Sequence, residues 1–149
     1  MRSILSIGSL EETRALGIKI GEKVQEGTVI TLSGDLGAGK TTLTQSIAKG
    51  LGITKTVSSP TFTICKIYYG RLPLYHFDAY RLEGSEDDLG FEEMIEGDGL
   101  AVIEWPQYID YMIPEDVLNI SIRLTGEQQR EMSFTAQGEK SIQLLKEIL

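Results

Sequence analysis

Eight consecutive residues carry the strongest chemical signal in the sequence. The run GDLGAGKT, from Gly34 to Thr41, matches G-x-x-x-x-G-K-[ST], the loop that wraps the phosphates of a nucleoside triphosphate. In this loop the backbone N–H groups turn toward the β-phosphate, the lysine reaches the β- and γ-phosphates, and the last hydroxyl ligates Mg²⁺. Lys40 and Thr41 take those two roles here. The predicted nucleotide-binding residues of the loop are Asp35, Leu36, Gly37, Ala38, Gly39, Lys40, Thr41 and Thr42.

Two carboxylates at strand ends are candidates for holding Mg²⁺ or for orienting the attacking water. Glu104 follows the apolar run Leu100–Ile103, and Asp78 follows Leu74–Phe77. Parallel strands deliver their carboxyl ends to the phosphate-loop edge of a sheet, so either acid can reach a bound triphosphate. Glu104 occupies the place of a Walker B acid. The alternative for each is a surface acid at a strand end.

Other side chains near these motifs have simpler explanations. Hydroxyls of Ser58, Ser59 and Thr61 could reach Mg²⁺ or the γ-phosphate, as switch segments do, but composition favours a capped turn. The single histidine, His76, is predicted to be structural, and no Cys/His cluster indicates zinc. Trp105 is predicted to pack beside a strand end.

The loop has the flanking elements that it needs. Thr28–Ser33 is a β-branched run typical of a buried strand, and Thr42–Leu51 has the apolar spacing of a helix. Before them, Ser3–Ile7 predicts a short strand, and Ser9 caps a helix that runs to about Val24. Strand, loop and helix therefore occur in the required order, and the helix points its positive end at the phosphates.

The rest of the chain predicts two antiparallel hairpins and three further helices. One hairpin joins Phe62–Tyr69 to Leu74–Phe77, and the other joins Val117–Leu124 to Arg130–Ala136. Helical patterns occupy Leu89–Ile95, Pro106–Met112 and Glu139–Leu149. The expected fold is one three-layer α/β domain over residues 1–149, a P-loop NTPase fold with a mainly parallel central sheet plus antiparallel hairpin additions.

Composition indicates the cellular location of this domain and the partners that it can bind. One cysteine, Cys65, cannot form an internal disulfide, which favours a reducing, cytoplasmic location. The sequence has no export signal and no apolar stretch long enough for a membrane span. Lys and Arg number 14 against 22 Asp and Glu, for a net charge of −8. A broad RNA-backbone footprint is therefore unexpected unless the bases cluster on one face, so another subunit is expected to hold any RNA.

Four segments together resemble a known family. They are GDLGAGKTT at Gly34–Thr42, SPTF at Ser59–Phe62, YHFDAYRL at Tyr75–Leu82, and VIEWP at Val102–Pro106. In this order they resemble the TsaE family, bacterial ATPases of tRNA threonylcarbamoyladenosine synthesis. The phosphate loop alone is common to many NTPases, but its combination with the other three motifs is specific, and the similarity spans essentially the whole chain.

The resemblance implies an activity and residue roles. It implies an ATPase that uses ATP and Mg²⁺ and acts with the TsaB and TsaD subunits, of which TsaD modifies adenosine 37 of tRNA. Hydrolysis would let this assembly complete repeated cycles, with tRNA contacted only through the complex. By the same resemblance Lys40 and Thr41 bind phosphate and metal, Glu104 is the metal-associated acid, and Asp78 is the acid needed for hydrolysis. Thr61 falls in a switch-like segment that contacts the nucleotide.

Three other functions remain open from the residues alone. A small-molecule or nucleotide kinase would share the loop but needs an acceptor pocket and usually a basic lid, and no arginine-rich lid is visible. A GTPase would need an N-K-x-D guanine motif, which the sequence lacks. A nucleotide-sensing module would use the bound state to control assembly, with incidental hydrolysis. The adenine contacts are expected near Thr13 or near Arg130.

Overall fold

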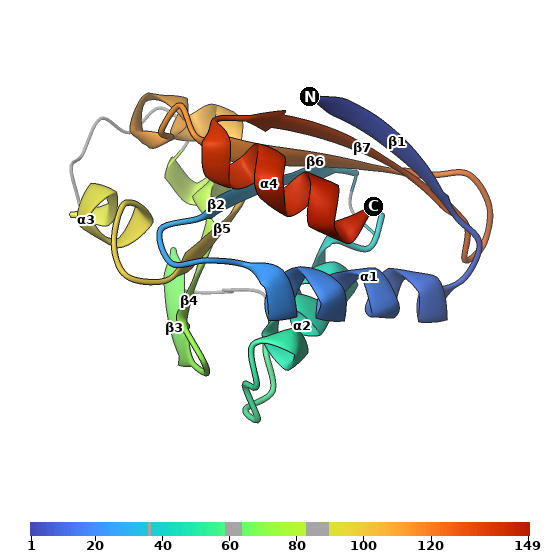
Figure 1. Ribbon diagram of the computed structural model, residues 1–149, viewed down its shortest axis with the longest axis horizontal. Helices are drawn as coiled ribbons and strands as arrows, with labels where there is room; N and C mark the ends of the chain where they lie inside the picture. The colour runs from blue at the N-terminus through green and yellow to red at the C-terminus, as the bar shows by residue number, and fades with distance from the viewer. Residues whose placement is uncertain (36, 59–63, 83–89) are drawn as a thin grey trace.

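The computed structural model describes residues 1–35, 37–58, 64–82 and 90–149, where seven strands form one sheet in the order β1-β7-β6-β2-β5-β4-β3 (Figure 1). The strands are β1 (Arg2–Ile7), β2 (Val29–Gly34), β3 (Cys65–Tyr69), β4 (Pro73–Asp78), β5 (Leu100–Glu104), β6 (Val117–Leu124) and β7 (Arg130–Gln137). The α-helices are α1 (Leu10–Lys23), α2 (Lys40–Gly50), α3 (Phe91–Ile95) and α4 (Glu139–Ile148).

The sheet has a parallel centre with antiparallel edges, which confirms the predicted fold. Strands β4, β5, β2 and β6 run parallel to one another. The predicted hairpins add β3 antiparallel to β4 at one edge and β7 antiparallel to β6 at the other, where β1 pairs with β7. All five residues of β5 are buried, as expected for a central parallel strand with both faces covered.

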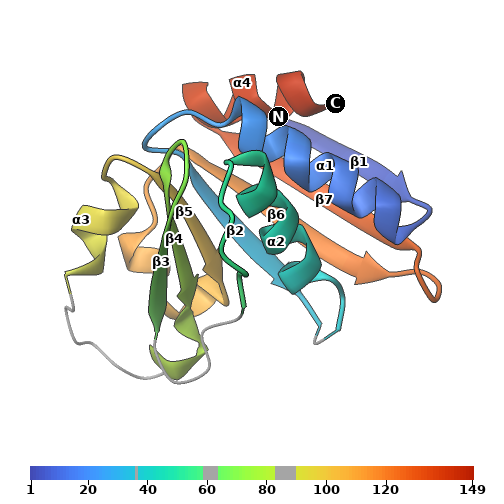
Figure 2. The ribbon, with the colours of Figure 1, turned by 90° about the horizontal axis from the view of Figure 1, so that it is seen from below.

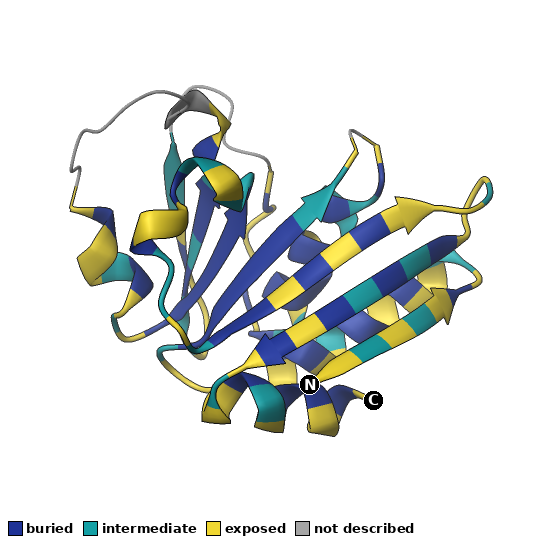
Figure 3. Ribbon diagram, turned by 90° about the horizontal axis from the view of Figure 1, so that it is seen from above, coloured by how far each residue is buried: buried dark blue, intermediate teal, exposed yellow. Residues whose placement is uncertain are grey.

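Helices cover the two faces of the sheet unequally. Figure 2 shows α1, α2 and α4 together on one face, where their apolar side chains pack on alternate residues of the central strands. On the other face, α3 and two short 3₁₀ turns cover only the end of the sheet formed by the central parallel strands and β3. Figure 3 shows the uncovered part, where buried residues alternate with intermediate or exposed ones along β6 and β7, and exposed residues alternate with intermediate ones along β1. The antiparallel strands thus have one solvated face.

Close packing of α1 against α2 fixes the helix that follows the phosphate loop. The Ser9 hydroxyl accepts a hydrogen bond from the Glu12 N–H and so caps α1, as predicted. A Cβ at Gly21 would overlap the backbone of α2 at Ile47 and Gly50, so only glycine permits this approach. The two helices therefore lie with their backbones in contact, which leaves α2 little freedom to shift.

Two predicted elements differ from the observed ones. The helix predicted at Pro106–Met112 is wrong, because the segment forms two 3₁₀ turns, Pro106–Tyr108 and Asp110–Met112. Between them Ile109 leaves helical geometry, with φ −136° and ψ 29°, and both Ile109 and Met112 are thereby buried. Of the strand predicted to start at Phe62, residues 62 and 63 lie outside the described ranges, Ile64 forms a bend, and the observed strand begins at Cys65.

A carboxylate distant in sequence caps α4. One oxygen of Asp116 accepts a hydrogen bond from the Lys140 N–H at 3.0 Å, and the other accepts from the Ser141 N–H at 3.0 Å and from the Ser141 hydroxyl at 2.7 Å. Burial raises the pKa of Asp116, but these hydrogen bonds and the charge of Lys140 outweigh it, so the pKa lies below its usual 3.8. The ionised form is therefore the stabilising one.

Replacing this cap should make the protein less stable at neutral pH only. Asp116→Asn keeps one acceptor oxygen and loses the other, so we expect the free energy of unfolding to fall by about 1 kcal/mol. A pKa lowered on folding contributes stability above the unfolded pKa and loses it as pH falls through the folded pKa. Urea unfolding of both proteins should therefore differ at neutral pH and converge below pH 3.8. The assignment would be contradicted if the difference in the free energy of unfolding between wild type and Asp116→Asn stayed the same in acid. It would also be contradicted if Glu139→Gln lowered the free energy of unfolding as much as Asp116→Asn does.

Candidate active site

The phosphate loop joins the central strand β2 to α2. Strand β2 ends at Gly34 and the helix starts at Lys40, as the motif requires. Gly39 has φ 110°, a left-handed conformation that favours glycine, and its carbonyl accepts the N–H of Leu43 at 3.0 Å. The loop therefore places the N-terminus of α2 at the end of β2, where the positive end of the helix favours a bound anion. Leu36 lies outside the described residues.

Arg130, which begins β7, holds the phosphate loop from the side. Its Nε donates to the carbonyl of Ala38 at 2.7 Å, a contact between residues 92 positions apart. Its Nη1 donates to backbone carbonyls of the β6–β7 turn at 2.9 to 3.4 Å, those of Gly126, Glu127 and Gln129. The guanidinium is buried and forms a bridge between that turn and the loop. From the sequence, Arg130 was considered as a contact for phosphate or base, with an exposed salt bridge as the default, and this bridge to the loop was not predicted.

Strand register places the two candidate carboxylates side by side. In the parallel pair of β4 and β5, Asp78 is the partner of Glu104. Both share the sheet face of Leu74 and Val102, which is the face that packs under α2. Two neighbouring carboxylates repel each other, so the pair favours a cation between them and the phosphates. The expectation that two strand ends bring their acids to the loop therefore agrees with the observed register.

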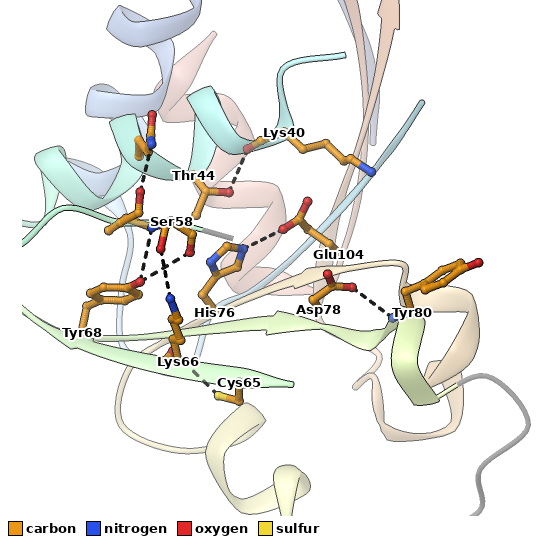
Figure 4. A network of polar contacts seen from close by, with 12 residues as sticks. Lys40, Thr44, Ser58, Cys65, Lys66, Tyr68, His76, Asp78, Tyr80 and Glu104 are labelled. Carbon is orange, nitrogen blue, oxygen red and sulfur yellow. Dashed lines mark hydrogen bonds and ion pairs between the residues drawn. The ribbon is translucent and has the colours of Figure 1, made fainter. Parts of the chain in front are cut away.

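One cavity of about 320 Å³ gathers most of the predicted site residues. Its lining residues are Gly37, Gly39, Lys40, Thr41, Thr42, Asp78, Glu104 and Trp105. Figure 4 shows Lys40, Asp78 and Glu104 approaching this region from α2, β4 and β5. Asp35 and Ala38 belong to the loop but do not line the cavity, and Thr61 lies outside the described residues.

Trp105 is the residue of this cavity that sequence reasoning treated as packing. Among the described residues, Trp105 is the sole non-glycine residue with positive φ, at 59°, a conformation that costs an L-residue roughly 1–2 kcal/mol. The Nζ of Lys40 lies 4.5 Å from the centre of its ring, a cation–π contact. Tyr80 packs on the indole with ring centres 5.1 Å apart. The strained backbone thus directs the indole to the phosphate lysine.

The single histidine reaches the site carboxylate. His76 Nε2 lies 2.8 Å from the Glu104 Oε2, and His76 is fully buried. Sequence reasoning predicted a structural histidine and found no link to the acid, because the contact depends on strand register.

The donor set of the cavity fits Mg²⁺. Within the described ranges, no group of three or more His, Cys, Asp or Glu side chains forms a metal centre made by protein alone. Mg²⁺ is usually held by one or two carboxylates together with substrate phosphates. Thr41, Asp78 and Glu104 supply such oxygen donors around the phosphate loop.

A second cavity, of about 440 Å³, lies against Arg130, the residue whose Nε bonds to the loop at Ala38. Its lining residues are Ser6, Ile7, Gly8, Glu12, Thr125, Gln129, Arg130 and Glu131. Thr13, the other residue considered for adenine, is buried in α1 with its hydroxyl donating to the Ser9 carbonyl.

Of the helices that the structure describes, none has the length and apolar character required to cross a bilayer.

Comparison with known proteins identifies the family. The model of the family "Threonylcarbamoyl adenosine biosynthesis protein TsaE" matches residues 7–132. The "tRNA threonylcarbamoyladenosine biosynthesis protein TsaE" of Bacillus subtilis (strain 168) is 47% identical over 139 residues, covering 93% of this chain and 88% of the relative. The protein of the same name from Treponema pallidum (strain Nichols) is 42% identical over 127 residues, covering 84% and 94%.

A solved structure agrees with this result. The crystal structure of Bacillus subtilis YdiB superposes with a TM-score of 0.86 and 40% identity, covering 99% of this chain and 94% of that one. The similarity therefore extends over the parallel sheet, the phosphate loop and the antiparallel edges alike. With a family match across most of its length, this chain belongs to the TsaE family of tRNA threonylcarbamoyladenosine biosynthesis, a family of P-loop nucleotide-binding proteins.

Proposed function

We propose that residues 1–149 form one domain that hydrolyses ATP with Mg²⁺ for threonylcarbamoyladenosine modification of tRNA at adenosine 37, acting in the cytoplasm with TsaB and TsaD. The observation that carries the proposal is the 320 Å³ cavity, which gathers the loop lysine, its threonine and two strand-end carboxylates. Phosphoryl transfer needs positioning and charge neutralisation more than a protein nucleophile, and this cavity offers both. Membership of the TsaE family supports the same assignment.

The predicted site residues have distinct proposed tasks. Lys40 binds the β- and γ-phosphate oxygens, and the N–H groups of the loop surround the β-phosphate. Thr41 and Glu104 hold Mg²⁺, which when bound offsets negative charge on the phosphates. Asp78, on the strand next to Glu104, orients the attacking water. Thr61 completes the set as a switch-segment contact.

The contact between Lys40 and Trp105 gives the lysine a defined position before nucleotide binds. The ring attracts the ammonium group of Lys40, which lines the same cavity as the carboxylates of Asp78 and Glu104. A bound triphosphate offers a full negative charge at short range, which attracts an ammonium group more strongly than an aromatic ring does. Lys40 therefore exchanges the indole for the γ-phosphate when ATP binds.

The second cavity is the proposed site of the adenine. Arg130 and Glu131 of its lining belong to β7, which lies on the other side of β2 from the strands that carry the two acids, so a nucleotide with its γ-phosphate near the acids would direct its base there. Arg130 forms one wall while its Nε stays bonded to Ala38. The base site and the phosphate site thus share a single structural bridge.

Steady-state ATP hydrolysis tests the proposal directly. We expect a slow Mg²⁺-dependent rate for the purified protein that rises when TsaB and TsaD are added together. GTP in place of ATP should give a lower rate. A rate indifferent to both subunits would contradict the partnership, and phosphate transfer to an added small-molecule acceptor would indicate a kinase instead.

A further inference from the structure

We infer that His76 is a positioning residue that holds Glu104 in the orientation needed to ligate Mg²⁺. The inference rests on the proposed function, which makes Glu104 the metal acid, and adds a residue that touches neither nucleotide nor metal. The geometry that carries it is a single buried hydrogen bond. His76 Nε2 lies 2.8 Å from Glu104 Oε2, and the exposed fractions of the two residues are 0% and 5% (Figure 4).

Strand register explains why this contact forms. His76 pairs with Val102 and Asp78 pairs with Glu104, so the histidine lies diagonally across from the acid on the same sheet face. Asp78, directly opposite Glu104, has a carboxylate oxygen bonded to the Tyr80 N–H at 3.1 Å. The two acids of the cavity are therefore each restrained by a partner outside it.

The bond also defines which ring nitrogen carries hydrogen. An ionised carboxylate only accepts hydrogen bonds, so His76 Nε2 must donate. Within the described part of the chain, Nδ1 is buried without a hydrogen-bond partner. A buried N–H without a partner is rare, which disfavours hydrogen on Nδ1. A ring nitrogen Nε2 that carries hydrogen therefore fits the contact with Glu104.

Holding one oxygen of Glu104 leaves the other available to the cavity. Lys40 and Glu104 line the same cavity, yet their charged groups form no ion pair. The carboxylate is bonded to His76 and the ammonium group lies over Trp105, so each is kept from neutralising the other. A Glu104 released from His76 would be free to pair with Lys40, which would occupy both a metal ligand and a phosphate ligand.

Two amide variants separate the hydrogen bond from simple packing. The side-chain nitrogen of glutamine can reach the position of Nε2, whereas that of asparagine is too short and falls near Nδ1. His76→Gln should therefore retain hydrolysis within about threefold of wild type. His76→Asn should raise the Mg²⁺ concentration for half-maximal rate by about 10- to 100-fold, the usual effect of losing a partner that orients a metal ligand. Equal behaviour of the two variants would overturn the inference.

Binding measurements give a readout that does not need turnover. Calorimetric titration with ATP should show equal affinities for wild type and both variants in EDTA, and with excess Mg²⁺ only His76→Asn should bind more weakly. An equal loss of affinity in EDTA would indicate general damage and would overturn the positioning role. Thermal unfolding of both variants provides the folding control.

Nuclear magnetic resonance can test the pair in the unmodified protein. His76 is the only histidine, so a chain without a histidine tag gives one set of imidazole signals that needs no assignment. We expect Nε2 to be protonated and Nδ1 not, and Glu104→Ala to change this spectrum. A ring protonated on Nδ1 alone would overturn the inference. If instead the spectrum is as expected but wild type hydrolyses no ATP, the proposed function fails, and the inference about metal positioning falls with it.

Discussion

Lys40→Ala is expected to lower kcat/KM for ATP hydrolysis by about 10²- to 10³-fold, or roughly 3–4 kcal/mol of transition-state stabilisation. The Lys40 ammonium group is buried beside the loop and is the cation of the cavity that can reach the γ-phosphate. Charge that develops on the transferred phosphoryl group would then lack its counter-charge. Steady-state hydrolysis with saturating Mg²⁺ measures the loss.

A second lysine of the same helix provides the matched control. Lys49 lies in the last turn of α2 and is exposed, so Lys49→Ala should hydrolyse ATP at the wild-type rate. Lys40→Arg retains the charge but presents a broad planar group, and we expect it to recover little activity. Turnover of Lys40→Ala equal to wild type would show that the cavity is not the catalytic site.

Substituting either acid should slow turnover strongly, with a different kinetic signature for each. For Glu104→Gln we expect a 10- to 100-fold higher Mg²⁺ requirement together with a lower kcat, because a metal ligand is lost. For Asp78→Asn we expect kcat to fall by about 10²-fold or more at an unchanged Mg²⁺ requirement, because the water loses its orienting group. Hydrolysis rates across a Mg²⁺ series distinguish the two acids.

The same variants decide between an ATPase and a nucleotide sensor. Each should be assembled with TsaB and TsaD and assayed for threonylcarbamoyladenosine formed on tRNA over several turnovers. We expect ATP binding and assembly to persist and repeated modification to stop. Glu92→Gln, an exposed acid of α3, serves as the control with full activity. Modification that continues without hydrolysis would favour the sensing module.

Local patterns predicted the elements that depend on local physics. The strand, loop and helix around Gly34–Thr41 follow from a motif and from apolar periodicity within a few residues, and both hairpins follow from turn composition. The helix predicted after Glu104 was wrong, because tertiary packing determines the backbone conformation of this segment. Trp105 takes a left-handed conformation beside Lys40, and Ile109 turns into the core, so seven residues with helical composition form two short turns.

Contacts between distant strands explain what the sequence could not predict at the site. Both strand-end acids were identified from their positions, but their pairing as direct neighbours depends on the register of β4 and β5. The bond from His76 to Glu104 depends on that same register, and a single histidine in an apolar run has no local feature that indicates it. A one-residue shift would turn His76 to the opposite face.

The bridge from Arg130 to Ala38 has a consequence for how the protein is made. A ribosome completes the motif Gly34–Thr41 long before it reaches Arg130, so a growing chain holds the phosphate-binding sequence without the guanidinium that fixes its Ala38 carbonyl. A translation product that stops before Arg130 therefore contains the whole motif but not the finished loop. The phosphate loop therefore takes the geometry described here only when β7 is in place beside it.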